Sequence, residues 1–340
     1  MPFTLVTGGC GFIGSNFIRQ IRAEEPGRSI LNLDLLSYAG NLENLTSLES
    51  DEGYRFVKGD ITDAEFVAKL FKEYEIDRVV HFAAESHVDR SILGPSVFIQ
   101  TNVMGTQVLL EAARAAWPEG QGRFLMVSTD EVYGSLGETG LFREDTPLDP
   151  SSPYSASKAA ADMLCIAYHR TFGFPVVLSR CSNNYGPYQF PEKLIPLMIQ
   201  RASQGEKLPV YGDGLNVRDW IHVDDHNRAL RLILEKGEAG RVYNVGADNE
   251  QANLHIVESI LDRLNQPREL IEYVTDRPGH DRRYAMDSTR LQQELAWRPQ
   301  VEFGEGLAST VDWYMDNRKW WARILSGEYR DYYERQYEGR

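Results

Sequence analysis

The chain has 340 residues, of which 42% are hydrophobic and 25% are charged, and its formal net charge is -14. This length allows a full hydrophobic core divided between two lobes, and the composition is ordinary for a globular protein. The acidic balance argues against binding to nucleic acid or to anionic membranes, because both require a basic surface.

Strands and helices are predicted to alternate through the first half of the chain. Short apolar runs predict strands at 3–6, 30–33, 54–57, 78–82, 124–127 and 175–178. Helical patterns lie between them at 12–25, 63–74 and 96–116, and a further helix begins near Ser152. This alternation is typical of an α/β fold with a Rossmann-like doubly wound parallel sheet, in which ligands bind at the carboxyl ends of the strands.

The pattern changes after about residue 180. Turn-rich stretches separate shorter helical patterns at 192–204, 224–236, 254–264 and 303–316, and the run 242–245 predicts a strand that returns to the main sheet. We therefore expect a Rossmann domain of residues 1–180 plus about 219–247, and a smaller mixed α/β lobe of residues 181–218 and 248–340. The aromatic tail from Trp313 to Tyr337 is expected to pack against the body of the protein.

The three cysteines, Cys10, Cys165 and Cys181, lie far apart in the chain. Their spacing fits neither a zinc site nor a disulfide framework, so we expect small packing residues in a reducing compartment and no metal. The N-terminus begins directly with a strand pattern, and no run of about 18 apolar residues follows. We therefore expect a cytoplasmic protein with no membrane span.

A glycine-rich loop follows the first predicted strand. Residues 7–14 read Thr-Gly-Gly-Cys-Gly-Phe-Ile-Gly and satisfy G-x-G-x-x-G from Gly9. Such glycines allow a tight turn and let the backbone approach a pyrophosphate at a helix N-terminus. Asp34 ends the second strand, where an acid accepts ribose hydroxyls and repels a 2′-phosphate, so NAD is expected rather than NADP. Asp60, at the end of the third strand, fits equally a contact to adenine and an ordinary turn acid.

Two adjacent carboxylates, Asp130 and Glu131, follow Thr129 at the end of the strand at 124–127. Tyr154 and Lys158 are four residues apart on a predicted helix and share one face. The lysine cation is expected to lower the tyrosine pKa toward the range of a working base. Asp130 must be protonated to act as an acid, so its pKa should be raised, whereas Glu131 must stay ionised. The combination predicts a dehydration built around a transient oxidation.

Together these features resemble the extended short-chain dehydrogenase/reductase family, and especially its nucleotide-sugar branch. Stretches at 84–91, 129–131, 183–194, 216–220 and 276–281 narrow the resemblance to the dTDP-glucose 4,6-dehydratases, over almost the whole chain. The resemblance implies a lyase with tightly bound NAD that converts dTDP-glucose to dTDP-4-keto-6-deoxyglucose. The implied route is oxidation at C4, loss of water across C5 and C6, and return of the hydride to C6. A homodimer through the helices near 96–116 and 152–172 is also implied.

The resemblance also implies roles for individual residues. Tyr154 would take the proton of the sugar 4-hydroxyl, which Thr129 would orient. Glu131 would remove the C5 proton, and Asp130 would protonate the departing 6-hydroxyl. The expected cofactor-binding residues are Gly8, Gly11, Phe12, Ile13, Gly14, Asp34, Ser37, Asp60, Ile61, Ala83, Ala84, Thr101, Tyr154, Lys158 and Asn184. The expected substrate-binding residues are Ser86, Thr129, Asn183, Glu192, Lys193, Leu194, Pro209, Tyr211, Arg218, Asn253, Arg277 and His280. His87 and His222 are interpreted as structural, because neither has a companion histidine at a metal-ligand spacing.

Two other functions share part of this pattern. A nucleotide-sugar 4-epimerase would use the same glycine loop, Tyr-Lys pair and ketone, but it needs no acid and base after Thr129. A catalytically silent NAD-binding protein would be expected to lack the tyrosine, the lysine or a glycine of the loop, and all of them are present. The sequence leaves open whether the nucleotide base is thymine or uracil, and which pathway uses the product.

Overall fold

A seven-stranded parallel sheet forms the larger part of this computed structural model, which describes residues 2–276 and 280–326. Its strand order is β10-β6-β5-β4-β1-β2-β3, and every pair of neighbours is parallel. The strands are β1 (Phe3–Thr7), β2 (Ser29–Asp34), β3 (Tyr54–Lys58), β4 (Ile76–His81), β5 (Arg123–Thr129), β6 (Val176–Cys181) and β10 (Val242–Val245). The predicted doubly wound sheet is confirmed, including the strand at 242–245 that returns to it.

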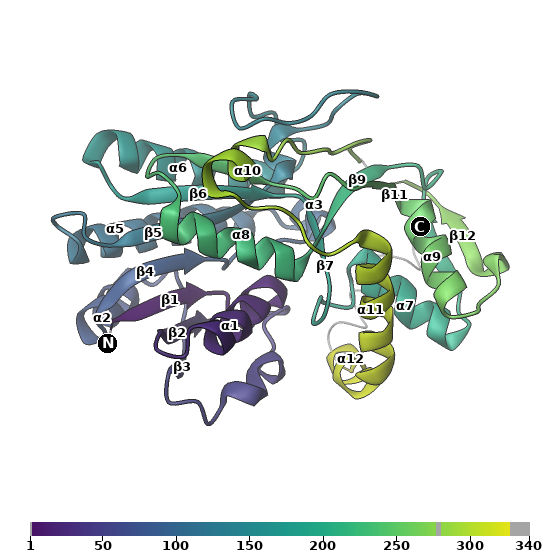
Figure 1. Ribbon diagram of the computed structural model, residues 1–340, viewed down its shortest axis with the longest axis horizontal. Coiled ribbons are helices and arrows are strands. Elements are labelled where there is room, and N and C mark those ends of the chain that lie inside the picture. Colours follow the sequence, from purple (N-terminus) through teal and green to yellow (C-terminus); the bar gives the residue numbers. More distant parts are fainter. Residues whose placement is uncertain (1, 277–279, 327–340) are drawn as a thin grey trace.

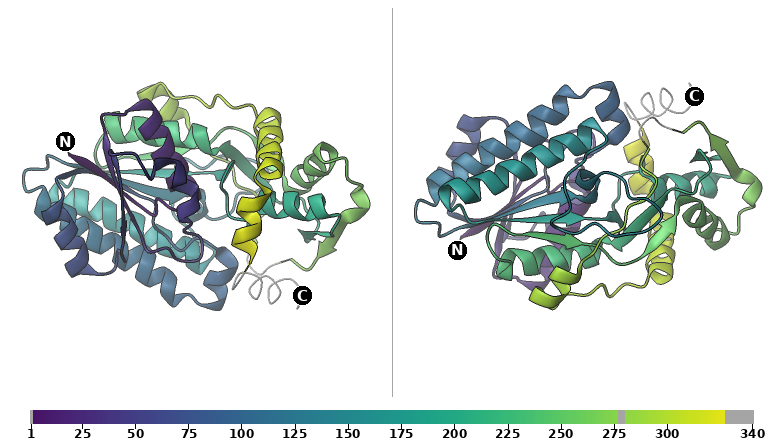
Figure 2. Two further views of the ribbon diagram at one scale, coloured as in Figure 1. Left: turned by 90° about the horizontal axis from the view of Figure 1, so that it is seen from below. Right: turned by 90° about the horizontal axis from the view of Figure 1, so that it is seen from above.

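Helices cover both faces of this sheet, as Figures 1 and 2 show. One face carries α1 (Phe12–Glu24), α8 (Val223–Lys236) and α10 (Thr289–Leu295). The other face carries α2 (Ala64–Glu73), α6 (Pro153–Phe172) and one continuous helix made of α4 (Ser96–Phe98), η2 (Ile99–Gly105) and α5 (Thr106–Ala116). Each face has its own apolar core, because the strands of a fully covered parallel sheet bury side chains on both sides.

The smaller lobe contains two short sheets that the sequence analysis did not predict. β9 (Val217–His222) lies between β7 (Asn183–Tyr185) and β11 (Glu250–Ala252), and β8 (Leu208–Tyr211) pairs with β12 (Ile271–Val274). The helices of this lobe are α7 (Leu194–Gln204), α9 (Asn253–Arg263), α11 (Phe303–Asp316) and α12 (Arg318–Leu325). Short helical segments elsewhere are η1 (Leu42–Leu48), α3 (Val88–Leu93), η3 (Asp130–Tyr133) and η4 (Arg268–Leu270).

The chain crosses between the two parts more than once. Leu291 and Leu295 of α10, together with Trp297, lie in the same apolar core as α8 and β10. The chain then enters the smaller lobe again at α11, where Leu307 and Val311 join its core. The division into a Rossmann domain (1–180 and about 219–247) and a smaller lobe (181–218 and 248–340) stays a prediction.

The aromatic residues near the end of the described chain pack as expected. The Trp313 ring lies 4.6 Å from that of Tyr188, and Trp320 Nε1 donates a hydrogen bond to Asn44 Oδ1 at 2.9 Å. The part of the predicted aromatic tail beyond residue 326 lies outside the described residues. Among the helices that the structure describes, none combines the length and the apolar character needed to cross a membrane.

Candidate active site

A cavity of about 330 Å³ opens at the carboxyl ends of β1, β2, β4, β5 and β6. We call it the central cavity. Every residue expected to bind the cofactor lines it: Gly8, Gly11, Phe12, Ile13, Gly14, Asp34, Ser37, Asp60, Ile61, Ala83, Ala84, Thr101, Tyr154, Lys158 and Asn184. The expected catalytic residues Thr129, Asp130 and Glu131 line it as well. The parallel sheet therefore gathers groups from across the first half of the chain into one place.

The glycine loop between β1 and α1 is shaped for a close approach of a ligand to the backbone. A Cβ atom on Gly14 would lie 2.5 Å from the carbonyl oxygen of Gly8, and Gly8 itself has a φ of 70°. Gly11 is the N-cap of α1, so no side chain caps the first turn, and that turn contains no acidic residue. An uncapped helix N-terminus beside glycines suits an anionic diphosphate. The loop therefore fits the pyrophosphate of a dinucleotide such as NAD.

Asp34 and Asp60 hold turns of the chain while they border the cavity. Asp34 Oδ2 accepts the N–H of Cys10 at 2.9 Å, and Oδ1 accepts the N–H of Leu36 at 2.8 Å. Each carboxylate oxygen has further lone pairs, so these bonds leave capacity for ribose hydroxyls. Asp60 Oδ1 accepts the N–H of Thr62 at 2.8 Å, as an ordinary turn acid does. A contact from Asp60 to adenine stays a prediction.

The acid and the base lie on η3, a short 3₁₀ turn directly after β5. Thr129 Oγ1 caps this turn by accepting the N–H of Glu131 at 3.3 Å, and it lies 3.2 Å from Asp130 Oδ1. Asp130 is 2% exposed, whereas Glu131 is only half-buried. Burial, together with the charge of Glu131, raises the pKa of Asp130 well above its usual value. The raised pKa expected of a general acid is therefore found at Asp130.

Tyr154 and Lys158 lie one turn apart near the start of α6. The helix begins with a capping box between Ser152 and Ser155, which fixes its first turn. Lys158 Nζ donates a hydrogen bond to the carbonyl oxygen of Val127 at 2.8 Å, and burial lowers the pKa of Lys158. This places the ammonium group at the end of β5, beside the turn with the two carboxylates.

The expectation that Lys158 lowers the pKa of Tyr154 is wrong for this structure. Burial raises the pKa of Tyr154 well above its usual value, and the charge of Glu131 adds to the effect. A hydrogen bond with Thr129 acts in the opposite direction but is the weaker influence. Tyr154 therefore holds its proton in the chain alone, because desolvation and nearby carboxylates both disfavour the phenolate.

Besides Thr129, four of the expected substrate-binding residues line the central cavity: Ser86, Asn183, Glu192 and Lys193. Lys193 Nζ donates a hydrogen bond to the carbonyl oxygen of Ser86 at 3.2 Å. Burial raises the pKa of Glu192 to about 7, although Lys193 opposes the effect. His87 caps α3 by accepting the N–H of Arg90 at 3.4 Å, which supports its structural interpretation. Its Nε2 also lies 3.7 Å from Glu192 Oε2.

His222 is structural in the same way as His87. It caps α8 by accepting the N–H of Asp224 through Nδ1 at 3.3 Å. Its ring packs edge-on against Tyr185 at 5.3 Å. No group of three or more potential metal ligands occurs among the residues that the structure describes.

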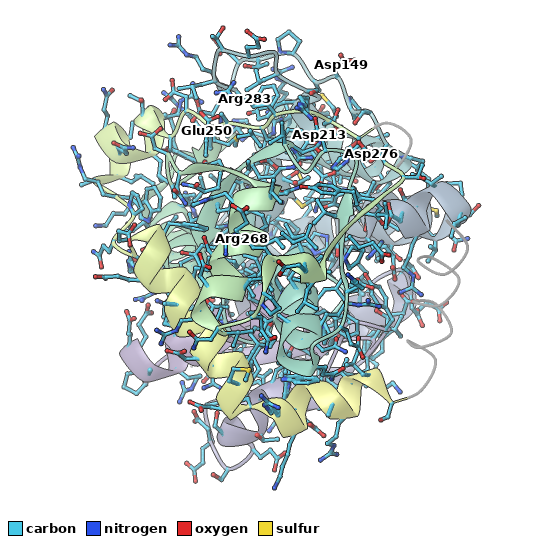
Figure 3. All side chains as sticks on the ribbon, turned by 90° about the vertical axis from the view of Figure 1, so that its right-hand side faces the viewer. Asp149, Asp213, Glu250, Arg268, Asp276 and Arg283 are labelled. Atoms are coloured by element: carbon cyan, nitrogen blue, oxygen red, sulfur yellow. The ribbon has the colours of Figure 1, made fainter. Side chains whose placement is uncertain are left out.

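The remaining expected substrate residues lie in the smaller lobe, outside the lining of the central cavity. They are Leu194, Pro209, Tyr211, Arg218, Asn253 and His280, while Arg277 lies outside the described residues. Tyr211 and His280 pack edge to face at 6.1 Å. Arg218 donates to the carbonyl oxygen of Asp281 at 2.9 Å, and its charge acts on the pKa of Asp130. Arg218 therefore acts on the turn of Asp130 and Glu131 from the smaller lobe, the part of the molecule that faces the viewer in Figure 3.

Several residues of the cavity were missed in the sequence analysis, among them Tyr38, Glu85 and Gln189. The Arg90 guanidinium lies 3.9 Å from the centre of the Tyr38 ring, and the ring of Phe190 lies 5.6 Å from it. Tyr38 directly follows Ser37 after β2, and Glu85 stands between Ala84 and Ser86 after β4. Both residues follow the carboxyl end of a parallel strand, where ligands bind in this kind of sheet, so their position alone could have predicted them.

Comparison with known proteins places the chain in a family. The profile of the GDP-mannose 4,6 dehydratase family matches residues 5–310. The chain is 56% identical to dTDP-glucose 4,6-dehydratase of Xanthomonas campestris pv. campestris, over 97% of this chain and 98% of the relative. It is 49% identical to dTDP-glucose 4,6-dehydratase 1 of Escherichia coli K12, over 99% of each chain.

Solved structures show the same relationship. DesIV of Streptomyces venezuelae, a dTDP-glucose 4,6-dehydratase crystallised with NAD, is 51% identical and superposes with a TM-score of 0.91 over 94% of this chain and 99% of its own. UDP-glucose 4-epimerase of Thermotoga maritima shares the fold with a TM-score of 0.86 over 93% of this chain and 99% of its own, but only 30% of the sequence. Matches of this length and identity show that the chain belongs to the family of nucleotide-sugar dehydratases formed by the dTDP-glucose 4,6-dehydratases and their GDP-mannose 4,6 dehydratase relatives.

Proposed function

We propose that this protein is an NAD-dependent hydro-lyase that converts dTDP-glucose to dTDP-4-keto-6-deoxyglucose. The observation that carries the proposal is the buried carboxyl group of Asp130, whose pKa is raised, beside Glu131 and in the same cavity as Tyr154 and Lys158. An epimerase would use the last two residues but not the first two. The high identity to dTDP-glucose 4,6-dehydratases supports the same conclusion.

The residues of the chain divide the proton chemistry between two elements. On α6, Tyr154 accepts the proton of the sugar 4-hydroxyl, while Lys158 lies one turn away and can reach a ribose hydroxyl. NAD, held by the glycine loop and Asp34, would supply the acceptor for the C4 hydride and the donor for C6, and its cationic ring would favour the Tyr154 phenolate. Thr129 orients the 4-hydroxyl by hydrogen bonding.

The elimination uses the two carboxyl groups of η3, Asp130 and Glu131. A ketone at C4 makes the proton on C5 acidic, and Glu131 removes this proton. Asp130 gives its proton to the departing 6-hydroxyl, so that water leaves from C6. Return of the hydride to C6 would then be completed by Glu131, which gives its proton back to C5. The difference in burial between the two side chains is what assigns the acid and the base, because burial favours the neutral form of a carboxyl group.

The smaller lobe would hold the nucleotide diphosphate. Arg218 is buried and can clamp a phosphate through forked hydrogen bonds, and Tyr211 offers a ring beside His280 to a nucleotide base. Asn253 and Pro209 are assigned to the same group, and Arg277 is kept as a prediction. Within the central cavity, Ser86, Asn183, Glu192 and Lys193 would contact the sugar and the diphosphate, and Leu194 follows them at the start of α7.

The chain is further proposed to form a homodimer in the cytoplasm. Large apolar side chains are exposed along α3, α4, η2 and α6, and Leu93 is the most exposed of them at 74%. The others are Ile92, Val97, Ile99, Met104, Met163 and Phe172. Covering such a stripe with a second copy would remove apolar surface from water. All three cysteines are buried and free, which fits a reducing compartment.

The test is mass spectrometry of dTDP-glucose that carries deuterium at C4, after incubation with the protein. Loss of one water with deuterium on C6 would support the proposal. An unchanged mass with a galactose-configured product would show an epimerase instead. Absence of any reaction, with Tyr154→Phe as the inactive control, would overturn the substrate assignment, and UDP- and GDP-glucose would be tried next.

A further inference from the structure

The turn η3 (Asp130–Tyr133), which we call the catalytic turn, also carries a buried tyrosine, Tyr133. This side chain has no part in the proposed reaction. Tyr133 is the last residue of η3, two residues after Glu131, and it is buried without lining the cavity. Its ring stacks on Phe142 at 5.0 Å, and the Arg180 guanidinium lies 4.8 Å from the ring centre. Its hydroxyl donates a hydrogen bond to Asn244 Oδ1 at 2.8 Å.

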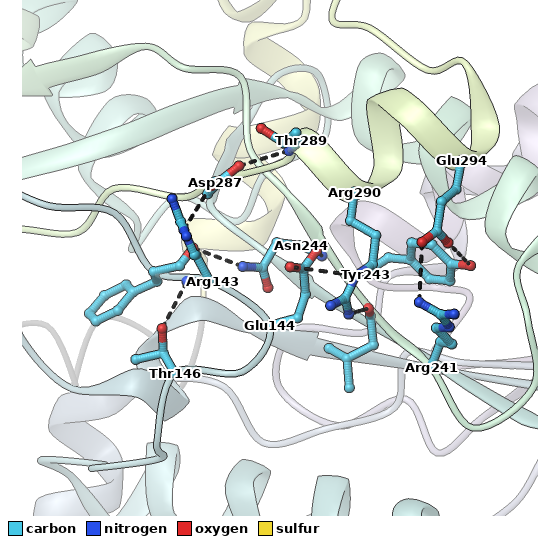
Figure 4. A network of polar contacts seen from close by, with 12 residues as sticks. Arg143, Glu144, Thr146, Arg241, Tyr243, Asn244, Asp287, Thr289, Arg290 and Glu294 are labelled. Atoms are coloured by element: carbon cyan, nitrogen blue, oxygen red, sulfur yellow. Dashed lines mark hydrogen bonds and ion pairs between the residues drawn. The ribbon is translucent and has the colours of Figure 1, made fainter.

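Asn244 is fixed in the orientation that accepts this bond. Its Nδ2 donates to the carbonyl oxygen of Phe142 at 2.9 Å, and its backbone N–H donates to Glu144 Oε1 at 3.1 Å (Figure 4). A carbonyl oxygen can only accept, so the amide nitrogen must face Phe142 and the amide oxygen must face Tyr133. Burial raises the pKa of Tyr133 to about 12, so its hydroxyl keeps the proton that it donates.

Arg180 connects the same group to the helix that carries the redox residues. Its Nε donates to Asp162 Oδ2 at 2.8 Å, and both side chains are almost completely inaccessible. Asp162 lies on α6, one turn beyond Lys158. Tyr133 therefore contacts, through Asn244, the edge strand β10 and, through Arg180 and Asp162, the helix of Tyr154.

We propose that Tyr133 and Asn244 are positioning residues for the elimination step, an inference that rests on the proposed function. Asp130 and Glu131 lie on a four-residue turn, which by itself has few hydrogen bonds to hold its geometry. The bond between Tyr133 and Asn244 fixes the end of this turn relative to the sheet, and so fixes Glu131 relative to the C5 proton of a bound sugar. Tyr154 and Lys158 lie on α6 and not on this turn, so we expect loss of the bond between Tyr133 and Asn244 to affect the elimination more than the oxidation.

The test compares Tyr133→Phe with Tyr243→Phe in the full-length enzyme with NAD. Tyr133→Phe removes one hydroxyl but keeps the ring that stacks on Phe142. The control removes the hydroxyl of the neighbouring residue on β10, which donates to Glu294 Oε2 at 3.0 Å, away from the turn (Figure 4). Because a shift of about 1 Å can cost about a hundredfold in rate, we expect the kcat of Tyr133→Phe to fall at least about tenfold. KM should stay unchanged in both variants.

Two further readouts separate positioning from general destabilisation. In Tyr133→Phe, deuterium at C5 should slow turnover more than it does in the wild type, and reduced nicotinamide should accumulate during turnover, because elimination becomes the slow step. A loss of activity without either change would show that Tyr133 is only structural, and wild-type values in all readouts would overturn the proposal outright. Absence of dehydration by the wild type would refute the proposed function instead.

A double-mutant cycle tests the partner. If Tyr133 and Asn244 act through their shared hydrogen bond, adding Asn244→Ala to Tyr133→Phe should lower kcat by much less than Asn244→Ala does in the wild type. Independent, multiplicative losses would assign the two residues separate roles and overturn the pairing. Since Tyr133→Phe alone tests the first part, the result does not depend on whether Asn244→Ala folds.

Discussion

Replacing Glu192 by glutamine is expected to stabilise the protein at neutral and alkaline pH. Burial raises the pKa of Glu192 from 4.5 to about 7. At about 1.4 kcal/mol per pKa unit, a difference of about 2.5 units corresponds to roughly 3 kcal/mol of unfolding free energy. This is a substantial part of the about 5–15 kcal/mol that is typical of the net stability of a folded domain.

The sign follows from which state holds the proton. Below pH 4.5, Glu192 is protonated in both the folded and the unfolded chain, and its ionisation costs nothing. Between pH 4.5 and about 7 the folded protein keeps a proton that the unfolded chain has lost, so stability falls as the pH rises. Above about pH 7 the full cost is present. Glutamine is neutral at every pH, so Glu192→Gln removes this dependence.

The assay is urea unfolding of wild type and Glu192→Gln at pH 5, 6, 7 and 8, with saturating NAD and no sugar nucleotide. The stability difference should move by about 2 to 3 kcal/mol in favour of the variant between pH 5 and pH 8. Glu235→Gln, at an exposed position on α8, should show no such trend. A difference between wild type and Glu192→Gln that is independent of pH would refute the reasoning, whatever its size.

Three further results are expected. Glu131→Gln should still reduce the bound cofactor with dTDP-glucose but release about a hundredfold less dehydrated product, as judged by absorbance and mass spectrometry, because the C5 base is lost; a wild-type rate would contradict that role. Titration should show NADP binding far more weakly than NAD, since Asp34 repels a 2′-phosphate, and equal affinities would contradict this assignment. Arg180→Ala should lower the unfolding free energy by about 3 to 5 kcal/mol, because it removes the ion-pair partner of the fully buried Asp162 side chain, and a loss below about 1 kcal/mol in urea unfolding would show that the pair is dispensable.

The main sheet could be predicted because each of its strands is marked by a short apolar run in the local sequence. The runs at 124–127 and 175–178 are almost purely hydrophobic, and each is preceded by a helical pattern, so the sequence near them is sufficient. The smaller lobe is different. β9 contains Arg218 and Asp219, which are buried and hydrogen-bonded: Arg218 donates to Asp281 O, and Asp219 Oδ1 accepts the N–H of Asn249. Those partners are distant in sequence, so no local pattern marks this strand.

The site shows the same division between local and distant causes. Loop glycines and strand-end acids follow from spacing, and the structure brings all of them to one cavity. The pKa of Tyr154 depends instead on how deeply the ring is buried and on how near Glu131 lies, relative to Lys158. Spacing on a helix fixes only that Tyr154 and Lys158 share a face. It does not fix how deeply the ring is buried or that Glu131 lies near it, and so the direction of the shift was wrong.

Dehydratase and epimerase are separated by a small part of the molecule. The 4-epimerase of Thermotoga maritima shares the fold over nearly the whole chain, so the fold alone does not decide the reaction. Both the dehydration and the epimerisation proceed through a ketone at C4. Which reaction follows depends on whether an acid and a base lie beside C6 and C5. In the proposed mechanism that choice lies in four residues after β5, where Asp130 is buried with a raised pKa and Glu131 is only half-buried. A turn that must hold two such groups in different environments needs support from behind, and the buried contacts of Tyr133 are placed to give it.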